Sequence, residues 1–299
     1  MARTPTILVP VDFSSHSRAA TERACVMARV SGARIRLLHA MYVLPVTVEY
    51  AISDTVWKDL RASEMEALES AKQAIEGRGI EIATCFEERY PADAIRAAAR
   101  GGDVEMIVMG SHGRRGIDRL LLGSVAERTV QAAPVPVLVV RESEAEASRP
   151  IRSILFATDF SEHAERAERV VAKWARAVGA EVEIIHAIRE TAVLFAPYAV
   201  PGSSDWEGEM KEAAQRRIEK VRARFEEAGV SAKSTIVYGL ASEEIIHQAE
   251  ASGAQVVAVG SRGYSALQRF VLGSVAQRVL RHAPCSVLVA GPRNDDRTP

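Results

Sequence analysis

Two sets of glycines in this sequence have the residue types and the spacing to bind an anion. Gly110 and Gly113 are followed after nine residues by Gly123 and Ser124. The second set has the same spacing and comprises Gly260, Gly263, Gly273 and Ser274. Because glycine tolerates positive φ and has no Cβ, the backbone amides of such a loop can approach phosphate oxygens. A helical pattern begins at each Gly-Ser pair, and the amides and dipole of a helix N-terminus also favour an anion, so these residues predict phosphate binding by the main chain.

The same residues also have a purely structural interpretation. Glycines after strands commonly serve only to turn the chain. Ser124 with Glu127, like Ser274 with Gln277, also fits a capping box. Because capping and phosphate binding can coexist at one helix, both interpretations stay open. Five arginines near the loops could add positive charge, namely Arg114, Arg115, Arg119, Arg262 and Arg269.

The pattern occurs twice because the two halves of the chain are related. Asp12 and Asp159 each follow an apolar run, and His39 recurs as His186. The longest match aligns residues 110–128 with residues 260–278. A repeat of about 150 residues is domain-sized, so each copy should fold around its own core. We expect domains at 1–142 and 151–292, an exposed polar linker at 143–150 and a tail at 293–299.

Each copy alternates apolar runs of strand length with amphipathic helical stretches. The first copy predicts strands at residues 6–11, 35–40, 81–87, 104–109 and 135–140, and the second at 154–157, 181–186, 232–237, 255–259 and 286–289. Helices are expected to end near Val30, to span about 57–76 and to begin at Pro91. Strands joined by helices form a parallel sheet that is covered on both faces. The sequence therefore predicts two tandem doubly wound α/β domains.

The pattern G-x2-G-x9-G-[ST], with an aspartate at the end of the first strand, resembles the nucleotide-binding signature of the universal stress protein family, here in a tandem form. The resemblance covers nearly the whole chain except the linker and the tail. It implies a five-stranded parallel sheet of order 3-2-1-4-5 in each domain, binding of ATP or AMP, and frequent dimerisation. That order would place Asp12 opposite Gly110 to Gly123, and Asp159 opposite Gly260 to Gly273, at the switch point where the strand order reverses.

The resemblance also assigns ligand contacts to individual positions. In the first copy the adenine and ribose contacts would be Pro10, Val11, Asp12 and Ala40, and the ribose and phosphate contacts Met109, Gly110, Gly113, Gly123, Ser124 and Val125. Their counterparts are Ala157, Thr158, Asp159 and Ala187, followed by Val259, Gly260, Gly263, Gly273, Ser274 and Val275. The copies differ after the second glycine, where Arg114 and Arg115 correspond to Tyr264 and Ser265. The phosphate affinity of the two sites could therefore differ.

The sequence gives little sign of catalytic machinery. No Gly-Lys dipeptide is present, which excludes a P-loop NTPase. His39 and His186 are isolated on apolar strands and fit structural, hydrogen-bonded histidines better than catalytic or metal-binding ones. His112 could face phosphate or solvent. We expect a nucleotide-binding stress or signalling protein without catalytic or metal-binding residues; the alternatives are a slow ATPase or phosphotransferase, and a structural interaction protein with vestigial sites.

Composition limits the partners. Lys and Arg number 38 against 39 Asp and Glu, so no basic field exists to hold nucleic acid. The three cysteines form no CxxC pair, which favours a reducing cytoplasm, and no apolar run is long enough to span a membrane. The fifth strands are predicted sheet edges that must be covered or paired. We therefore expect an intrachain pseudo-dimer of the domains or a homodimer, with an adenine nucleotide bound and Mg²⁺ as a possible companion.

Overall fold

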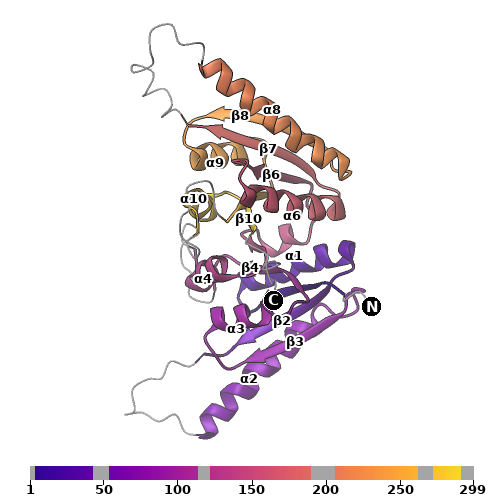
Figure 1. Ribbon diagram of the computed structural model, residues 1–299. Helices are drawn as coiled ribbons and strands as arrows, with labels where there is room; N and C mark the ends of the chain where they lie inside the picture. The colour runs from indigo at the N-terminus through magenta and orange to yellow at the C-terminus, as the bar shows by residue number, and fades with distance from the viewer. Residues whose placement is uncertain (1–3, 43–53, 114–121, 190–205, 262–271, 291–299) are drawn as a thin grey trace, which may run out of the picture. The chain divides into compact units, whose positions relative to one another are not determined.

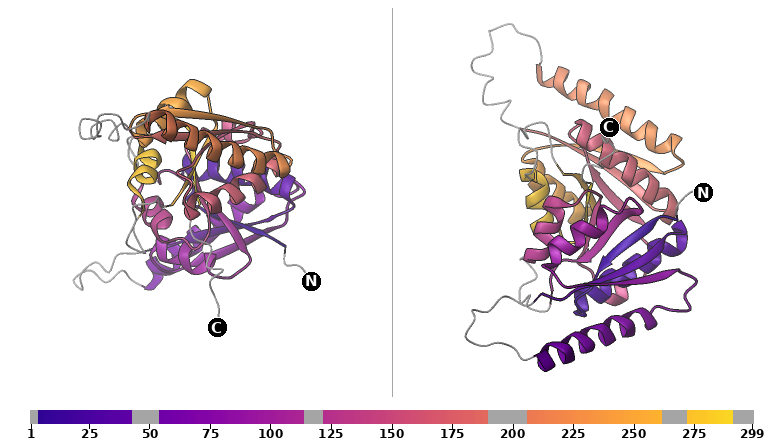
Figure 2. Two further views of the ribbon diagram at one scale, coloured as in Figure 1. Left: turned by 45° about the horizontal axis from the view of Figure 1, so that its top comes forward. Right: turned by 60° about the horizontal axis from the view of Figure 1, so that its bottom comes forward.

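The computed structural model describes residues 4–42, 54–113, 122–189, 206–261 and 272–290 (Figure 1). These residues form two compact units that meet at Pro150 and Ile151. Both units are α/β, with strands flanked by helices (Figure 2). No helix in the described ranges is long and apolar enough to cross a membrane.

The first unit alternates strands and helices as the sequence predicts. Its strands are β1 (Thr6–Pro10), β2 (Arg34–Ala40), β3 (Ile82–Glu87), β4 (Val104–Gly110) and β5 (Val137–Val140). Its helices are α1 (Ser15–Ser31), α2 (Asp54–Gln73), α3 (Pro91–Ala99), α4 (Ser124–Ala132) and α5 (Glu144–Ala147). The strands pair in parallel in the order β3-β2-β1-β4-β5, which is the order that the family resemblance implies.

The second unit repeats this path. Its strands are β6 (Ser153–Ala157), β7 (Glu181–Ile188), β8 (Ala232–Tyr238), β9 (Val256–Gly260) and β10 (Ser286–Ala290). Its helices are α6 (Glu162–Val178), α8 (Trp206–Glu227), α9 (Ala241–Ser252) and α10 (Ser274–His282). The strands again pair in parallel, in the order β8-β7-β6-β9-β10.

This strand order determines where the helices lie. In each unit the first two crossovers run in one direction along the sheet and the next two in the other. Because such crossovers are right-handed, the first pair of helices covers one face and the second pair covers the other. The contacts agree, since α3 packs on α4 and α9 packs on α10. The central strands are consequently buried on both faces, as their continuous apolar runs predict.

A charged cluster closes the amino-terminal ends of the first unit's strands. Asp103 accepts hydrogen bonds from Arg34 at 2.6 Å and from Arg36 at 2.5 Å, and Arg34 also donates to the hydroxyl of Thr6 at 2.7 Å. Burial alone would raise the pKa of Asp103, but the hydrogen bonds from Arg34 and then Arg36 outweigh it and lower that pKa to about 2. The cluster lies at the opposite end of the strands from Asp12, so its role is structural.

Residues 143–150, expected to form an exposed linker, contain a short helix. This helix, α5, begins with a capping box formed by Ser143 and Glu146, and Ala147 is fully buried. The helix packs on α1, where the fully buried Arg23 forms an ion pair with Glu142. Arg23 also donates to the carbonyl of Arg149 at 2.7 Å. Seven of the eight residues 143–150 are exposed, as expected, but the segment is not unstructured, because it contains α5 and packs on the first unit through Ala147.

Candidate functional site

Both aspartates lie directly after the first strand of their unit and are held in the same way. Ser14 donates its amide at 3.1 Å and its hydroxyl at 2.6 Å to Oδ1 of Asp12. Ser161 does the same for Asp159, at 3.0 and 2.6 Å. Each aspartate therefore has one carboxylate oxygen fixed by the following helix start, in an Asx turn.

The second oxygen of Asp12 faces the glycine loop. A Cβ atom built on Gly113 would lie 2.6 Å from Oδ2 of Asp12, so only glycine leaves the carboxylate in place. Gly113 is not among the glycines with positive φ, so the requirement here is the missing side chain. The expected approach of Asp12 to this loop is thus observed in the first unit. Gly263, its counterpart, lies outside the described residues.

Gly110 has a packing role in addition to the ligand contact expected of it, which stays a prediction. A Cβ atom at Gly110 would lie within 2.8–2.9 Å of the backbone of His16 on α1. Real Cβ atoms do not approach backbone so closely, and the helix cannot move without repacking against β4. Close packing of α1 against the end of β4 therefore explains this glycine without any ligand, and positive φ is not involved.

The two helix starts carry uncapped amides. The N-cap residues are Gly123 and Gly273, and neither helix has a side-chain cap. Ser124 and Ser274 are the first helical residues, so the capping-box alternative is wrong for both. Within the described chain, the amides of Ser124 and Val125, and of their counterparts, have no hydrogen-bond partner. These amides remain available to an anion.

Two of the amides expected to bind phosphate, those of Gly123 and Gly273, already form hydrogen bonds within the protein. Gly123 donates its amide to the carbonyl of Ser111 at 2.8 Å, and Gly273 donates to Ser261 at 2.9 Å. Both glycines also have φ near −60°, so positive φ explains neither. Their role is to bring the loop after the fourth strand against the helix start. The amides that could donate to an anion are those that follow these glycines.

The second unit contains a cavity of about 340 Å³ where the family resemblance placed the ligand. Nine of the ten expected residues line it: Ala157, Thr158, Asp159, Ala187, Val259, Gly260, Gly273, Ser274 and Val275. It reaches from the start of α10, across the ends of β9 and β6, to the end of β7. With neighbouring strands about 4.8 Å apart, β9 and β7 are separated by about 10 Å. The cavity thus has the uncapped amides of α10 at one end and Ala187 and Arg189, at the end of β7, at the other.

The corresponding residues of the first unit occupy equivalent places. Pro10 and Ala40 end β1 and β2, and Met109 and Gly110 end β4. Val11 and Asp12 follow β1, while Ser124 and Val125 begin α4. Val11 and Met109 are buried, as are their counterparts Thr158 and Val259, which line the cavity of the second unit. Ligand contact itself stays a prediction in both units.

The strand histidines have structural partners. Nδ1 of His39 lies 2.7 Å from the carbonyl of Val11, and Nδ1 of His186 lies 2.8 Å from that of Thr158. Burial lowers the pKa of His186, the hydrogen bond to the carbonyl of Thr158 opposes this effect, and Arg217 lowers the pKa further. These contacts agree with the structural interpretation. Among the described residues no group of three or more His, Cys, Asp or Glu could hold a metal.

The structure contradicts the alternative in which the side chain of His112 faces solvent. His112 is only 9% exposed, its ring lies 5.4 Å from that of His16, and Nδ1 is 3.1 Å from the hydroxyl of Ser111. Burial lowers its pKa, and His16 lowers it further. The position corresponds to Arg262, which lies outside the described residues, as do Arg114, Arg115, Arg119 and Arg269.

The structure adds residues that the sequence did not single out. Arg189 lines the cavity beside Ala187, and Ala241 and Ile245 of α9 form part of its wall. Arg189 has no hydrogen-bond or ion-pair partner in the described ranges, and the first copy has Tyr42 at this position. Its place in the sequence, two residues after Ala187, is the feature that could have identified Arg189 as a cavity residue. The family resemblance assigns no ligand contact beyond Ala187, so it does not single out Arg189.

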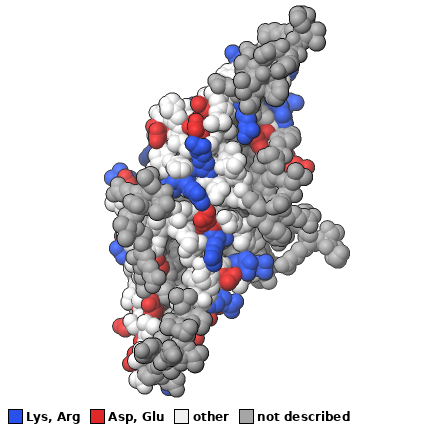
Figure 3. Space-filling view, turned by 90° about the vertical axis from the view of Figure 1, so that its left-hand side faces the viewer, with Lys and Arg blue, Asp and Glu red and all other residues white. Residues whose placement is uncertain are grey.

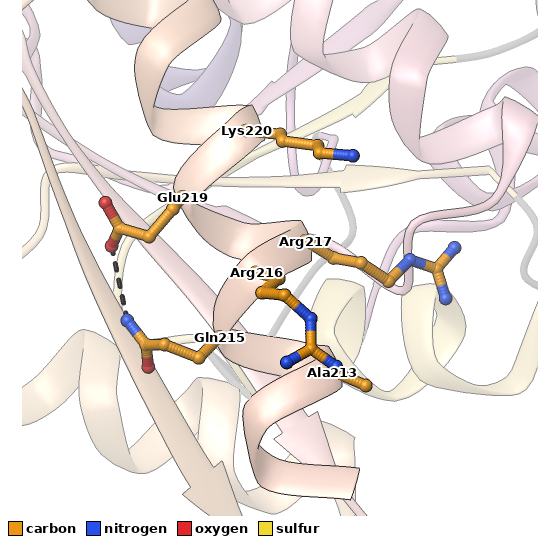
Figure 4. A pocket seen from close by; sticks show the side chains of 6 residues that line it. All are labelled: Ala213, Gln215, Arg216, Arg217, Glu219 and Lys220. Atoms are coloured by element: carbon orange, nitrogen blue, oxygen red, sulfur yellow. Dashed lines mark hydrogen bonds between the residues drawn. The ribbon is translucent and has the colours of Figure 1, made fainter. Parts of the chain in front are cut away.

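Another hollow, of about 550 Å³, lies along α8 (Figure 4). All of its lining residues, among them Arg216, Arg217 and Lys220, come from this one helix. It lacks the converging elements of a binding site, so the cavity at the strand ends is the better candidate. Basic and acidic side chains are interspersed on the face of the molecule shown in Figure 3, as the balanced composition predicts.

Comparison with known proteins agrees with this geometry. The universal stress protein family matches residues 4–141 and again residues 150–291. The chain belongs to the universal stress protein family. A universal stress protein of Mycobacterium tuberculosis, Rv2005c, is 27% identical over 95% of this chain and 96% of its own length. The universal stress protein MJ0577 of Methanocaldococcus jannaschii is 32% identical, over 48% of this chain and 96% of its own length.

A solved structure supports the tandem arrangement of this universal stress protein. The crystal structure of a universal stress protein from Archaeoglobus fulgidus has a TM-score of 0.74 and 25% identity, covering 96% of this chain and 98% of that one. MJ0577 matches about half of the present chain, whereas Rv2005c and the Archaeoglobus protein match nearly all of it. The expectation of a tandem universal stress protein is therefore confirmed.

Proposed function

We propose that this universal stress protein binds an adenine nucleotide, ATP or AMP, at the strand ends of each unit and acts in stress response or signalling in the cytoplasm. The observation that carries the proposal is the cavity of the second unit, which nine predicted residues line. Its volume of about 340 Å³ is within the range of small-molecule sites. The cytoplasmic location is supported by the three cysteines, which form no disulfide and so are compatible with a reducing compartment.

The residues at each end of the cavity fit the parts of such a ligand. The amides of Ser274 and Val275 would donate to phosphate oxygens at the start of α10. Asp159, which lines the cavity, would accept a ribose hydroxyl, because an ionised carboxylate is an acceptor only. The base would then lie beside Ala187 at the end of β7. Mg²⁺, if it accompanies ATP, would be bound by the phosphates, since no metal cluster lies among the described residues.

Nucleotide binding can regulate the protein only if the ligand prefers one conformation or assembly over another. We propose that this assembly includes an intrachain pseudo-dimer of the two units, or a homodimer. The supporting observations are the duplication and the place of β5 and β10, each last in the strand order of its own unit, where an uncovered strand would have to be covered or paired. Sedimentation of the fragment 1–150 is expected to show a dimer, and a strictly monomeric fragment would contradict this proposal.

Calorimetric titration of the full chain with ATP and AMP tests the nucleotide sites. We expect up to two ligands per chain, and we expect Gly113→Ala to weaken the first site about tenfold, or about 1.4 kcal/mol. The reason is that a Cβ at this position would displace the carboxylate of Asp12, 2.6 Å away. Because the end of the Asp12 side chain can move, the free energy of unfolding should change by less than about 1 kcal/mol.

The second unit is the internal control for this variant, because its own glycine is unchanged. A Gly113→Ala protein that retains both sites at full affinity would remove Gly113 and Asp12 from the proposed site. A wild-type chain that binds neither nucleotide, and that releases no small molecule on denaturation, would overturn the proposed function itself.

A further inference from the structure

The turn that follows each site aspartate has an uncommon backbone conformation. Phe13 has φ of 65° and Phe160 has φ of 60°, in the left-handed region. They are the only non-glycine residues with positive φ among those described, and they occupy corresponding positions in the two copies. A large side chain is rarely found in this conformation, so contacts outside the turn must hold it.

The rings of these phenylalanines supply one such contact. The ring of Phe13 lies 4.6 Å from that of His39, and the ring of Phe160 lies 4.3 Å from that of His186. Each histidine is in turn held to the carbonyl of the residue before the aspartate. The histidines at the ends of β2 and β7 therefore support the turn from the side of the sheet.

The carbonyl group of each phenylalanine is held by an arginine. Arg18 donates from Nη1 to the carbonyl of Phe13 at 3.0 Å. Arg217 donates from Nη2 to the carbonyl of Phe160 at 3.4 Å, and its guanidinium lies 4.6 Å from the centre of the Phe160 ring. Figure 4 shows Arg217 leaving α8 on the side opposite Gln215 and Glu219.

The two arginines are not related by the duplication. Arg18 belongs to α1, and the second copy has Glu165 at the corresponding position. Arg217 belongs to α8, and the first copy has Ala67 there. A guanidinium therefore reaches the carbonyl of the left-handed phenylalanine in both units, but it comes from a different helix in each. Inheritance from a single ancestral domain does not explain this coincidence, whereas a shared requirement of the two turns does.

We propose that Arg18 and Arg217 are positioning residues for the two nucleotide sites. Each fixes the left-handed phenylalanine, around which the aspartate folds back onto the amide and hydroxyl of Ser14 or Ser161. With this geometry Oδ2 of Asp12 lies beside Gly113, and Asp159 lines the cavity of the second unit. The proposal rests on the proposed function for its effect on ligand binding, but its effect on the turn can be measured without ligand.

Hydrogen exchange of single amides tests the turn in the unliganded full chain. The reporters are the amides of Ser14 and Ser161, which are bonded to Asp12 and Asp159 at 3.1 and 3.0 Å. We expect Arg18→Ala to accelerate exchange about tenfold at Ser14 and to leave Ser161 unchanged, and Arg217→Ala to do the reverse. Unchanged exchange at both reporters would overturn the proposal.

Two further variants separate the carbonyl contact from other effects. Arg29→Ala and Arg216→Ala remove exposed arginines from the same two helices and should change neither reporter. Arg18 also lies 3.3 Å from Glu144, but both side chains are more than half exposed, so this ion pair contributes little. Glu144→Gln should therefore leave Ser14 unchanged. An effect equal to that of Arg18→Ala would assign the role to the ion pair instead.

Calorimetry with ATP tests the consequence for binding. Arg217→Ala should weaken the second site about tenfold, and Arg217→Lys should recover part of the loss because a lysine can donate but cannot stack as a plane. In an Asp159→Ala background, Arg217→Ala should have no further effect, since the arginine acts through the aspartate. Additive losses would indicate a merely structural role. If the wild type binds no nucleotide, the proposed function fails while hydrogen exchange still decides the role of the arginines.

Discussion

Replacing Arg23 with alanine is expected to lower the free energy of unfolding of the first unit by about 3–5 kcal/mol. The side chain is fully buried in α1 and forms an ion pair with Glu142, whose own side chain is 12% exposed. Removal of the guanidinium would leave a carboxylate with little solvent and no countercharge, and the carbonyl of Arg149 would lose its donor. Urea unfolding followed by hydrogen exchange of first-unit peptides measures the loss, with the second unit as reference.

Two control variants show whether the unpaired charge is the cause. Arg29→Ala removes an exposed arginine from the same helix and should change the free energy of unfolding by less than about 0.5 kcal/mol. The double variant Arg23→Met with Glu142→Leu removes both charges and should recover much of the stability, since the penalty comes from leaving one charge unpaired. A loss below about 1 kcal/mol for Arg23→Ala would show that Glu142 finds water or another partner.

Asp103→Asn is expected to destabilise the first unit by about 2 kcal/mol at pH 7 and by progressively less in acid. The folded pKa of Asp103 is about 2, which is below the value of about 4 for an unfolded aspartate. The ionised carboxylate therefore contributes stability above that unfolded value, and this contribution is lost as the pH falls toward the folded pKa. Urea unfolding of wild type and variant at pH 7, 5 and 3 measures the difference, which should shrink below pH 5.

Asp93→Asn is the matched control, because Asp93 also pairs with an arginine, Arg96, but both side chains are substantially exposed. Its effect should stay below about 1 kcal/mol at every pH. If the difference between Asp103→Asn and wild type were the same at pH 7 and pH 3, the arginine cluster would not be what lowers the pKa of Asp103.

The strands could be predicted from sequence because the central ones are buried on both faces. Their apolar runs gave the bounds to within one or two residues, and the parallel order followed from the helical crossovers and the family resemblance. Strand β5 begins at Val137 rather than at residue 135, since Pro136 has no amide to donate. Helix α2 ends at Gln73, three residues early, where Ile75 and Glu76 turn with tighter hydrogen bonds. Such ends depend on local bonds that periodicity does not reveal.

The sequence predicted where the candidate site lies, but it did not predict which contacts require glycine at Gly110 and Gly123. Asp12 and the start of α4 lie where the spacing placed them, yet Gly110 is explained by the backbone of His16 and Gly123 by a bond to Ser111. Neither glycine needs positive φ; the left-handed residue is Phe13, which has no intrinsic preference for that conformation. Such contacts join residues far apart in sequence. No single-sequence pattern identifies them.

The folded segment around α5 also determines where the duplicated halves can be separated. A chain cut after residue 142 would retain Arg23 but lose the carbonyls of Glu146 and Arg149 to which it donates. The first half is complete only if it keeps the stretch through Arg149. Exchange or recombination of halves with another tandem protein should therefore place the junction between Arg149 and Ile151, at the end of the predicted linker and not directly after residue 142.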